Sequence, residues 1–330
     1  MSDSVSEHAG RRARVTLYAV GGTIAGSAAS RTNTTDYKVG IAAADLLAAV
    51  PEIAQIADVR HEQISNVPSS DVGAELLLKL SKAVTARLRD PDVDGVVVTH
   101  GTDTLPESAF FLDLTVASDK PVVFVGAMRP ASAVSADGPS NLLKAIALAG
   151  SPDAVGRGTL IALNDRIGSA FYTNKTHSTA VETFRAEDQG SLGTFINTRA
   201  RFWYGAAKPV DKPFFDVSDL DTLPKVAILY AYQDQDDLLI DAAIANGARG
   251  IVIAASGHGS VSTATKGRIR ELQAQGFPVV RATRTGNGVV AEKPEGIGAG
   301  VYSVTKARWL LALALASGAS LDRIREYFRA

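Results

Sequence analysis

The sequence predicts an α/β protein with a larger N-terminal domain, built on a parallel sheet, and a smaller C-terminal α/β domain. The first observation is an alternation of strand-length apolar runs with helical patterns through most of the 330 residues, which is typical of a parallel sheet covered by helices. The second is that these runs are rich in Val and Ile without two-residue alternation, as expected for strands buried on both faces. The third is the chain length, which favours two domains over one.

The N-terminal domain is predicted to alternate strands and helices from its start. Strands are expected at residues 14–20, 58–64, 95–99, 121–125 and 159–163. Helical patterns occupy residues 42–49, 74–89, 107–117 and 141–149. This alternation predicts a parallel sheet with helices on both of its faces.

The C-terminal domain repeats the pattern on a smaller scale. Strands are expected at residues 225–229, 250–254 and 278–281, and helices at residues 237–245, 263–275, 304–316 and 321–328. Residues 206–224 contain three prolines with Lys and Asp and show no periodicity, so we interpret them as a linker. The predicted organisation is a disordered lead at 1–12, an N-terminal domain at 13–205, the linker at 206–224 and a C-terminal domain at 225–330.

Composition and charge exclude several classes of function. A net charge of −1 argues against a nucleic-acid or membrane-surface role, because both rely on an excess of basic residues. The absence of cysteine excludes disulfides, thiolate zinc sites, iron–sulfur clusters and cysteine nucleophiles. The first twelve residues contain no apolar signal segment, and the apolar stretch at 309–316 is too short to span a bilayer. We therefore expect a cytoplasmic protein.

Two glycines and a threonine follow the first predicted strand. Gly21, Gly22 and Thr23 come directly after its apolar run. Glycines let the backbone turn sharply and approach a ligand closely, and a threonine hydroxyl at such a strand end can be a nucleophile if another group removes its proton. A Gly-Gly pair after a strand is more often a simple turn, so the interpretation depends on a second strand end.

That second strand end follows residues 95–99 and is densely polar, with the sequence THGTDT at residues 99–104. In open parallel sheets, ligands bind at the carboxyl ends of strands. Polar groups after a buried strand are costly unless they face a site or a hydrogen-bond network. Capping by Asp103 or Thr104, with Glu107 in the first helical turn, explains one or two of these residues but not the whole run. The pattern therefore favours a functional site.

Three further positions have a functional and a simpler interpretation. Lys175 is either a solvated loop lysine or, if buried near a threonine, a proton acceptor, because desolvation lowers a lysine pKa; a neighbouring carboxylate would oppose that change. Residues 27–40 have the length and composition of a lid, although Tyr37 could simply anchor that loop by packing. Ser69 fits a turn or a helix cap equally well.

Several common catalytic and cofactor motifs are missing. The five histidines show no metal-ligand spacing, and the sequence has no HExxH pair. A GxSxG elbow, a P-loop and a complete GxGxxG are also absent. We therefore expect neither a metal nor another cofactor.

Taken together, these residues resemble the bacterial-type L-asparaginase/glutaminase family. Two signature motifs match in wording and order, GGTIAG at residues 21–26 and VVTHGTDTL at residues 97–105. Shorter matches support them: GAMRP at 126–130, SADGP at 135–139, KT at 175–176 and KAR at 306–308. The resemblance covers nearly the whole chain after the first dozen residues.

The resemblance implies a two-step hydrolysis and an oligomer. Thr23 would attack the side-chain amide of L-asparagine, giving a β-aspartyl ester and ammonia, and water would then hydrolyse the ester. Tyr37 matches a lid tyrosine that assists proton removal from Thr23. Thr102, Asp103 and Lys175 match a second triad that activates a hydroxyl or water. The family is usually a homotetramer built from intimate dimers.

The resemblance also assigns the binding of the substrate. Ser69 matches the residue that binds the α-carboxylate, and Asp103 the one that binds the α-ammonium. Ser70 stands where the family usually has Gln or Glu, a longer residue that helps to hold the ammonium. Asp234 stands where the family lends an Asn to the neighbouring active site, and Glu292 is a candidate for a second cross-subunit group. These departures bear on substrate affinity and on the preference for asparagine over glutamine.

Three readings of function follow. The leading hypothesis is an L-asparagine amidohydrolase with some glutaminase activity. A related amidase with another amide substrate is the nearest alternative, and a catalytically silent amino-acid-binding protein of the same fold is a more distant one. The nucleophile, base and lid residues together argue against the silent protein, because a pure binder needs none of them.

Overall fold

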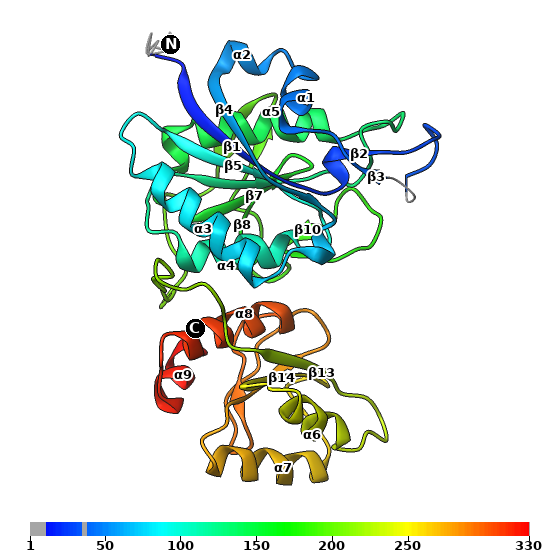
Figure 1. Ribbon diagram of the computed structural model, residues 1–330, viewed down its shortest axis with the longest axis vertical. Helices are drawn as coiled ribbons and strands as arrows, with labels where there is room; N and C mark the ends of the chain where they lie inside the picture. The colour runs from blue at the N-terminus through cyan, green and yellow to red at the C-terminus, as the bar shows by residue number, and fades with distance from the viewer. Residues whose placement is uncertain (1–10, 35–37, 330) are drawn as a thin grey trace.

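The computed structural model describes residues 11–34 and 38–329. Two α/β domains are stacked along the long axis of the molecule, and the larger, N-terminal one lies above the smaller, C-terminal one in Figure 1. An eight-stranded sheet organises the first domain and a four-stranded sheet the second. The predicted fold class is confirmed.

The core of the N-terminal sheet is parallel, as predicted. It consists of β7, β6, β5, β1 and β4 side by side in that order. β1 lies between β4 and β5, with Val15 opposite Val59 and Leu17 opposite Val97. The five strands are β1 (Ala13–Gly21), β4 (Ala57–Val67), β5 (Gly95–Thr99), β6 (Val122–Val125) and β7 (Thr159–Leu163).

Three further strands extend the sheet in antiparallel fashion and were not predicted: β8 (Arg166–Ser169), β11 (Gly193–Ile196) and β12 (Arg199–Phe202). β7 turns into β8 through Asn164 and Asp165, both at positive φ (48° and 61°). This two-residue loop matches the twist of a hairpin and favours Asn and Asp. The Asn-Asp pair was therefore a usable signal, but β8 itself is too short and mixed to read as a strand.

Helices cover both faces of this sheet, so both faces are apolar. Along β5, Val96 and Val98 face one core cluster while Val97 faces the other, which explains why the strands show no polar alternation. The first cluster includes residues of α3 (Ala74–Leu88) and α4 (Leu105–Thr115). The second includes residues of α1 (Ala43–Ala48), α2 (Ile53–Ile56) and α5 (Gly138–Ala149).

Short elements decorate the carboxyl end of the sheet. They are the 3-10 turns Thr23–Ala25 and Ser69–Asp71 and two small antiparallel pairs. The pairs are β2 (Gly26–Ser27) with β3 (Lys38–Val39), and β9 (Asn174–Lys175) with β10 (Phe184–Arg185). A further 3-10 turn, Pro152–Ala154, lies at the opposite end of the sheet, before the start of β7.

The C-terminal domain has a parallel sheet of β13 (Val226–Tyr230), β14 (Gly250–Ala255), β15 (Val279–Thr283) and β16 (Ile297–Gly298). Its helices are α6 (Leu238–Ala245), α7 (Thr263–Ala274), α8 (Val304–Ala316) and α9 (Leu321–Tyr327). Apart from β16, each was predicted to within a few residues. Across residues 11–34 and 38–329, no helix combines the length and apolar character needed to cross a membrane.

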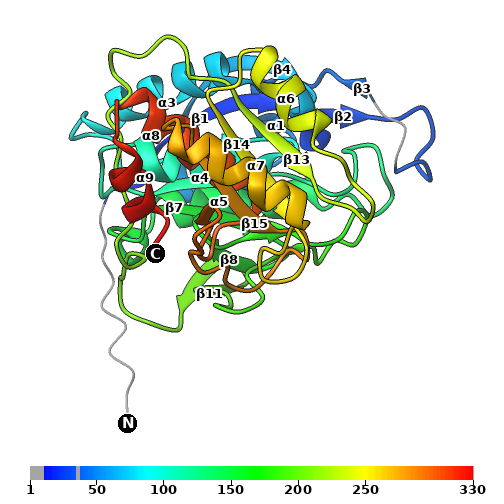
Figure 2. The ribbon, with the colours of Figure 1, turned by 90° about the horizontal axis from the view of Figure 1, so that it is seen from below.

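Helix α8 joins the two domains. It lies on the side of the C-terminal domain that faces α4 (Figures 1 and 2). The ring of Trp309 packs edge-on against Phe111 of α4, with centroids 5.3 Å apart. Buried residues of α8 and α4 belong to one continuous apolar cluster, so the two domains of the chain share part of their core.

Residues 206–224, predicted as a linker, contain neither helix nor strand, but they are packed. Phe215 and Val217 are buried in the core shared by the domains. The Phe215 amide donates to the Leu114 carbonyl at 2.8 Å, and Lys212 Nζ lies 2.8 Å from Asp113 Oδ1. The segment therefore connects the domains while it is packed and hydrogen-bonded against α4.

Candidate active site

The carboxyl ends of β1, β4 and β5 meet at a junction that only glycines can form. A Cβ on Gly22 would lie 2.1 Å from the main-chain N and Cα of Gly101, and one on Gly21 would lie 2.5 Å from the Val67 carbonyl oxygen. A Cβ on Gly101 would lie 2.7 Å from Ser69 Cβ. Gly21 and Gly22 also have positive φ, 122° and 87°. The two threonine motifs therefore touch backbone to backbone, and the Ser69 side chain packs directly on Gly101.

Thr23 opens the 3-10 turn that follows this junction. The Ala25 amide donates to the Gly22 carbonyl at 2.9 Å, which closes the turn. Thr23 is only 4% exposed. Ile24 packs behind it, 3.2 Å from the position of a Cβ on Gly138 of the SADGP motif. The first threonine is thus held at the end of β1 by close packing on both sides.

Lys175, Thr102 and Asp103 come together as predicted. Lys175 Nζ donates to Thr102 Oγ1 at 3.1 Å and to Asp103 Oδ1 at 2.6 Å. The lysine side chain is 14% exposed, whereas that of Asp103 is 74% exposed. Lys175 therefore spans from a buried hydroxyl to a carboxylate that is open to solvent. The solvated-loop interpretation of Lys175 is wrong.

Ser69 and Ser70 begin the 3-10 turn after β4. Ser69 is buried against Gly101, and its carbonyl accepts a hydrogen bond from Thr104 Oγ1 at 2.7 Å. Ser70 is exposed. The hydroxyl of Thr104, which sequence reasoning considered as a helix cap, instead ties the second threonine motif to the Ser69 segment.

His100 supports the second motif from within the core. Its Nδ1 donates to the Gly101 carbonyl at 2.8 Å, and its ring packs against Phe124 with centroids 5.9 Å apart. Complete burial lowers the His100 pKa to about 4. The ring is therefore neutral at pH 7 and fixes the backbone that leads into Thr102.

Asp137 is an organising residue whose role sequence reasoning did not identify. Its carboxylate accepts the backbone amides of Met128 and Arg129, each at 3.0 Å, and the side-chain amide of Asn141 at 3.1 Å. Asn141 also donates to the Gly126 carbonyl at 3.1 Å. The GAMRP and SADGP motifs thus brace one another beneath the threonine motifs.

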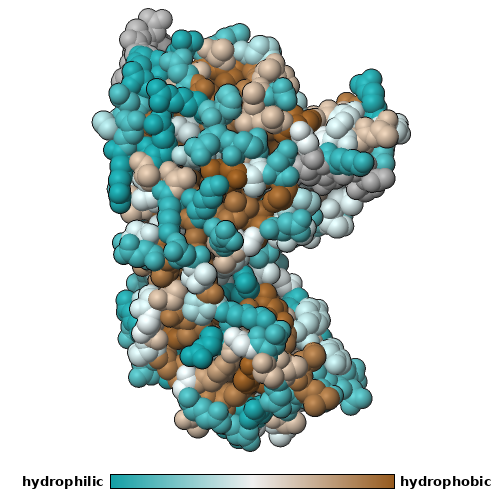
Figure 3. All heavy atoms as spheres, viewed as in Figure 1, coloured by the Kyte–Doolittle hydropathy of each residue, from teal (hydrophilic) through white to brown (hydrophobic). Residues whose placement is uncertain are grey.

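Tyr37 lies outside the described residues. The described part of residues 27–40 includes the β2–β3 pair, which projects beyond the end of β1 (Figure 1). In Figure 3 the surface is indented between this projection and the C-terminal domain.

A cavity of about 360 Å³ adjoins the Lys175–Asp103 pair. Its walls come from both domains and include Glu107 from α4 and Tyr230, Thr283 and Arg284 from the C-terminal domain. Small-molecule sites usually have volumes of roughly 300–1,000 Å³ and a few convergent polar groups. The cavity has the size and mixed charge to admit an amino acid.

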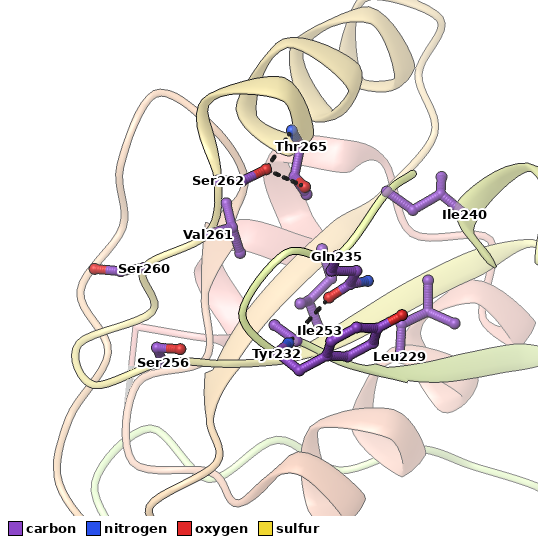
Figure 4. A pocket seen from close by; sticks show the side chains of 11 residues that line it. Leu229, Tyr232, Gln235, Ile240, Ile253, Ser256, Ser260, Val261, Ser262 and Thr265 are labelled. Atoms are coloured by element: carbon purple, nitrogen blue, oxygen red, sulfur yellow. Dashed lines mark hydrogen bonds between the residues drawn. The ribbon is translucent and has the colours of Figure 1, made fainter. Parts of the chain in front are cut away.

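The two remaining predicted residues, Asp234 and Glu292, belong to the C-terminal domain. Asp234 is exposed at φ 65° in the turn after β13, where the Tyr232 amide donates to Gln235 Oε1 at 3.2 Å. This turn borders a second, separate cavity of about 190 Å³ lined by hydroxyl and aliphatic side chains (Figure 4). Glu292 forms an ion pair with Arg325 of α9, at 3.2 Å.

Comparisons with known proteins agree over both domains. Residues 14–207 match the family model "Asparaginase, N-terminal", and residues 225–328 match "Glutaminase/Asparaginase C-terminal domain". L-asparaginase 2 of Bacillus subtilis (strain 168) is 48% identical over 95% of this chain and 85% of its own length. L-asparaginase 2-3 of Saccharomyces cerevisiae is 45% identical over 95% of this chain and 89% of its own.

Two further relatives differ in their stated location. A crystal structure of a probable cytoplasmic L-asparaginase from Campylobacter jejuni is 42% identical, with a TM-score of 0.91 over 96% of this chain and 99% of that one. A probable periplasmic L-asparaginase of Haemophilus influenzae is 41% identical over 95% of this chain and 92% of its own length. Both likenesses extend through the two domains.

Proposed function

Because the chain belongs to the asparaginase/glutaminase family, we propose that it is an amidohydrolase that converts L-asparagine to L-aspartate and ammonia, with L-glutamine as a minor substrate. The observation that carries the proposal is the contact of Lys175 with both Thr102 and Asp103. It forms beside the glycine junction from which the buried Thr23 emerges. A binding protein would need neither nucleophile nor base at that place.

In the first step, Thr23 Oγ attacks the side-chain amide carbon of asparagine. The hydroxyl proton passes to a base, for which we propose the lid residue Tyr37. The C–N bond then breaks, and the nitrogen leaves as ammonia after gaining a proton. The product is a β-aspartyl ester on Thr23, so one difficult amide hydrolysis is divided into two easier steps.

In the second step, water attacks the ester carbon and releases L-aspartate. Lys175, as the neutral amine, is the proposed proton acceptor, either directly or through Thr102, which lies within hydrogen-bond distance. Asp103 holds the lysine from its other side. A general base in this position typically contributes about 10²–10⁴-fold to the rate. The chemistry requires only substrate, water and side chains, so we propose that no cofactor is needed.

The substrate is proposed to bind through its zwitterionic end. The exposed carboxylate of Asp103 would take the α-ammonium, and Ser69, with the adjoining backbone, would take the α-carboxylate. A bound ammonium would compete with Lys175 for the Asp103 carboxylate. Ser70 is exposed next to Ser69 and is shorter than the family's usual Gln or Glu, so the ammonium has one fewer partner on that side.

We also propose a homotetramer built from intimate dimers, in which Asp234 and Glu292 approach the site of a neighbouring subunit. Large apolar side chains exposed on the C-terminal domain support an oligomer, among them Tyr230, Tyr232 and Leu238. Sedimentation analysis tests the assembly. Mixing Thr23→Ala subunits with Asp234→Ala subunits tests whether a site needs residues from two chains, because mixed oligomers would then regain activity.

The domain organisation and location are proposed on the same family basis. Residues 13–205 would form the catalytic domain, 206–224 the connection and 225–330 the C-terminal domain, with 1–12 as a lead. The ends of the two family-model matches support this division. A cytoplasmic location is supported by the likeness to the Campylobacter jejuni protein, and cell fractionation distinguishes it from the periplasm of the Haemophilus influenzae relative.

The decisive test is ammonia release from L-asparagine, L-glutamine and D-asparagine by the wild type and by Thr23→Ala and Thr102→Ala. The proposal predicts release from L-asparagine foremost, with both substitutions lowering turnover by orders of magnitude. Binding of aspartate without any ammonia release would identify a catalytically silent protein. Release from another amide only would identify a related amidase. Undiminished activity in Thr23→Ala would refute the nucleophile but not the reaction.

A further inference from the structure

A lysine of the C-terminal domain is buried directly behind the segment that carries Lys175. Lys306 is 1% exposed in the first turn of α8. Its Nζ donates to the main-chain carbonyls of Phe171, at 3.0 Å, and Thr173, at 2.7 Å. Thr173 precedes Lys175 by two residues, so this hydrogen bond is formed close to the proposed catalytic lysine.

This position is energetically unfavourable for a lysine, for two reasons. Burial of an ammonium is unfavourable, and burial lowers the Lys306 pKa to about 7. The first turn of a helix also carries the positive end of its dipole, which disfavours a cation. The charged groups that face it are Asp113 and Glu107, both of α4, and the ring of Phe110 lies 5.7 Å from Nζ. None of them forms a hydrogen bond to Nζ within the described part of the chain.

The backbone that Lys306 holds is a tight turn. The amides of Tyr172 and Thr173 both donate to the Ser169 carbonyl, at 3.2 and 2.9 Å. A Cβ on Gly168 would lie 2.2 Å from Thr173 Oγ1, so the turn folds back onto β8. This leaves the Phe171 and Thr173 carbonyls pointing to α8, and Lys306 gives each the single hydrogen bond found for it among the described residues.

We propose that Lys306 is a positioning residue for the hydrolytic reaction: by holding these two carbonyls, it sets where Lys175 stands relative to Thr102. The inference rests on the proposed function for its kinetic consequence. It makes the C-terminal domain of each chain a determinant of catalytic geometry in the N-terminal domain of the same chain. A misplacement of about 1 Å at a catalytic group can cost roughly 10²-fold in rate.

The test compares Lys306→Met with Lys306→Gln, which have side chains of equal length but differ in their ability to donate a hydrogen bond. Leu311→Ala is the matched control. Leu311 is fully buried on the same helix but packs toward Gly250 of β14, away from the turn. Thermal unfolding of each variant is measured beside kcat and KM for L-asparagine, and the crystal structure of Lys306→Met is determined.

We expect Lys306→Met to lower kcat about tenfold or more with KM changed by less than about threefold, and Lys306→Gln to recover part of the loss. Leu311→Ala should be destabilised without a comparable loss of kcat. In the crystal, Lys175 Nζ should move out of hydrogen-bond distance of Thr102. The proposal is overturned if kcat of Lys306→Met falls no further than that of Leu311→Ala, or if Lys175 keeps its place.

Two outcomes separate this proposal from the proposed function. If the wild type releases no ammonia, the proposed function fails, and the position of Lys175 in the variant crystal still decides the role of Lys306. Should Lys306→Met fail to fold, Lys306→Gln takes its place in the same comparison. A Gln variant with wild-type Lys175 geometry and a tenfold lower kcat would contradict the positioning role.

Discussion

Replacing Gly22 with alanine is expected to damage both stability and activity, because of where its Cβ would fall. That atom would lie 2.1 Å from the N and Cα atoms of Gly101. Both contacts are backbone atoms, so no side-chain rotation can relieve them. The strand ends that carry Thr23 and Thr102 would have to separate by more than 1 Å to restore an ordinary contact of about 3.5 Å.

The cost has two parts, which a matched control separates. At φ 87° and ψ −173°, a region nearly restricted to glycine, an alanine costs roughly 1–3 kcal/mol in backbone strain. The forced separation of packed segments adds roughly 1–3 kcal/mol, so we expect a loss of about 2–6 kcal/mol in the free energy of unfolding. Gly276 has a similar φ of 77°, and a Cβ there would meet nothing within 4 Å. Gly276→Ala should therefore show only the first part.

The assay is denaturant unfolding of both variants at one protein concentration, with ammonia release measured on the folded protein. Gly22→Ala should lose roughly 10²-fold in kcat/KM, because the two threonine segments are displaced, while Gly276→Ala keeps wild-type kinetics. Equal destabilisation of the two variants, with Gly22→Ala fully active, would refute the reasoning that the junction fixes the site.

Three further outcomes follow from the same contacts. Lys175→Met should lower kcat by about 10²–10⁴-fold, because it removes the hydrogen bond to Thr102; a loss confined to KM in the ammonia assay would contradict its role as a base. Ser70→Gln should lower KM for L-asparagine, because it restores a longer partner for the ammonium; an unchanged or higher KM counts against this. Lys306 should make stability depend on pH. Its folded pKa is about 7 and its ordinary value 10.5, so the unfolded chain holds one more proton between these values. The free energy of unfolding should therefore rise with pH across this window, by up to about 1.4 kcal/mol per unit relative to Lys306→Met. Parallel pH profiles in denaturant unfolding would show that Lys306 does not titrate there.

Much of the fold could be predicted because the strands are buried on both faces. A short, continuous apolar run between two helical patterns, such as residues 95–99, is best explained as a strand buried on both faces. The antiparallel extension was missed because β8, β11 and β12 have only four residues each and mix polar with apolar side chains. Tertiary pairing at the sheet edge, rather than local pattern, makes them strands.

Candidate site residues could be predicted where the neighbouring sequence marks them. They could not be predicted where their contacts are with residues distant in the sequence. Thr102 and Asp103 follow a recognisable buried strand, so position alone marks them. Lys175 was ambiguous, because only the fold shows that it contacts Thr102, 73 residues away. The roles of Asp137 and Lys306 could not be predicted, since each acts through main-chain groups that the sequence does not place in space.

Trapping the acyl-enzyme intermediate shows whether Thr23 is the residue that carries the acyl group. The enzyme is mixed with saturating L-asparagine, quenched rapidly in acid and digested, and the peptides are weighed by mass spectrometry. We expect an added aspartyl residue on the peptide that contains Thr23, and none in Thr23→Ala. An aspartyl residue on the Thr102 peptide instead, or ammonia release during turnover with no acylated peptide at all, would contradict it.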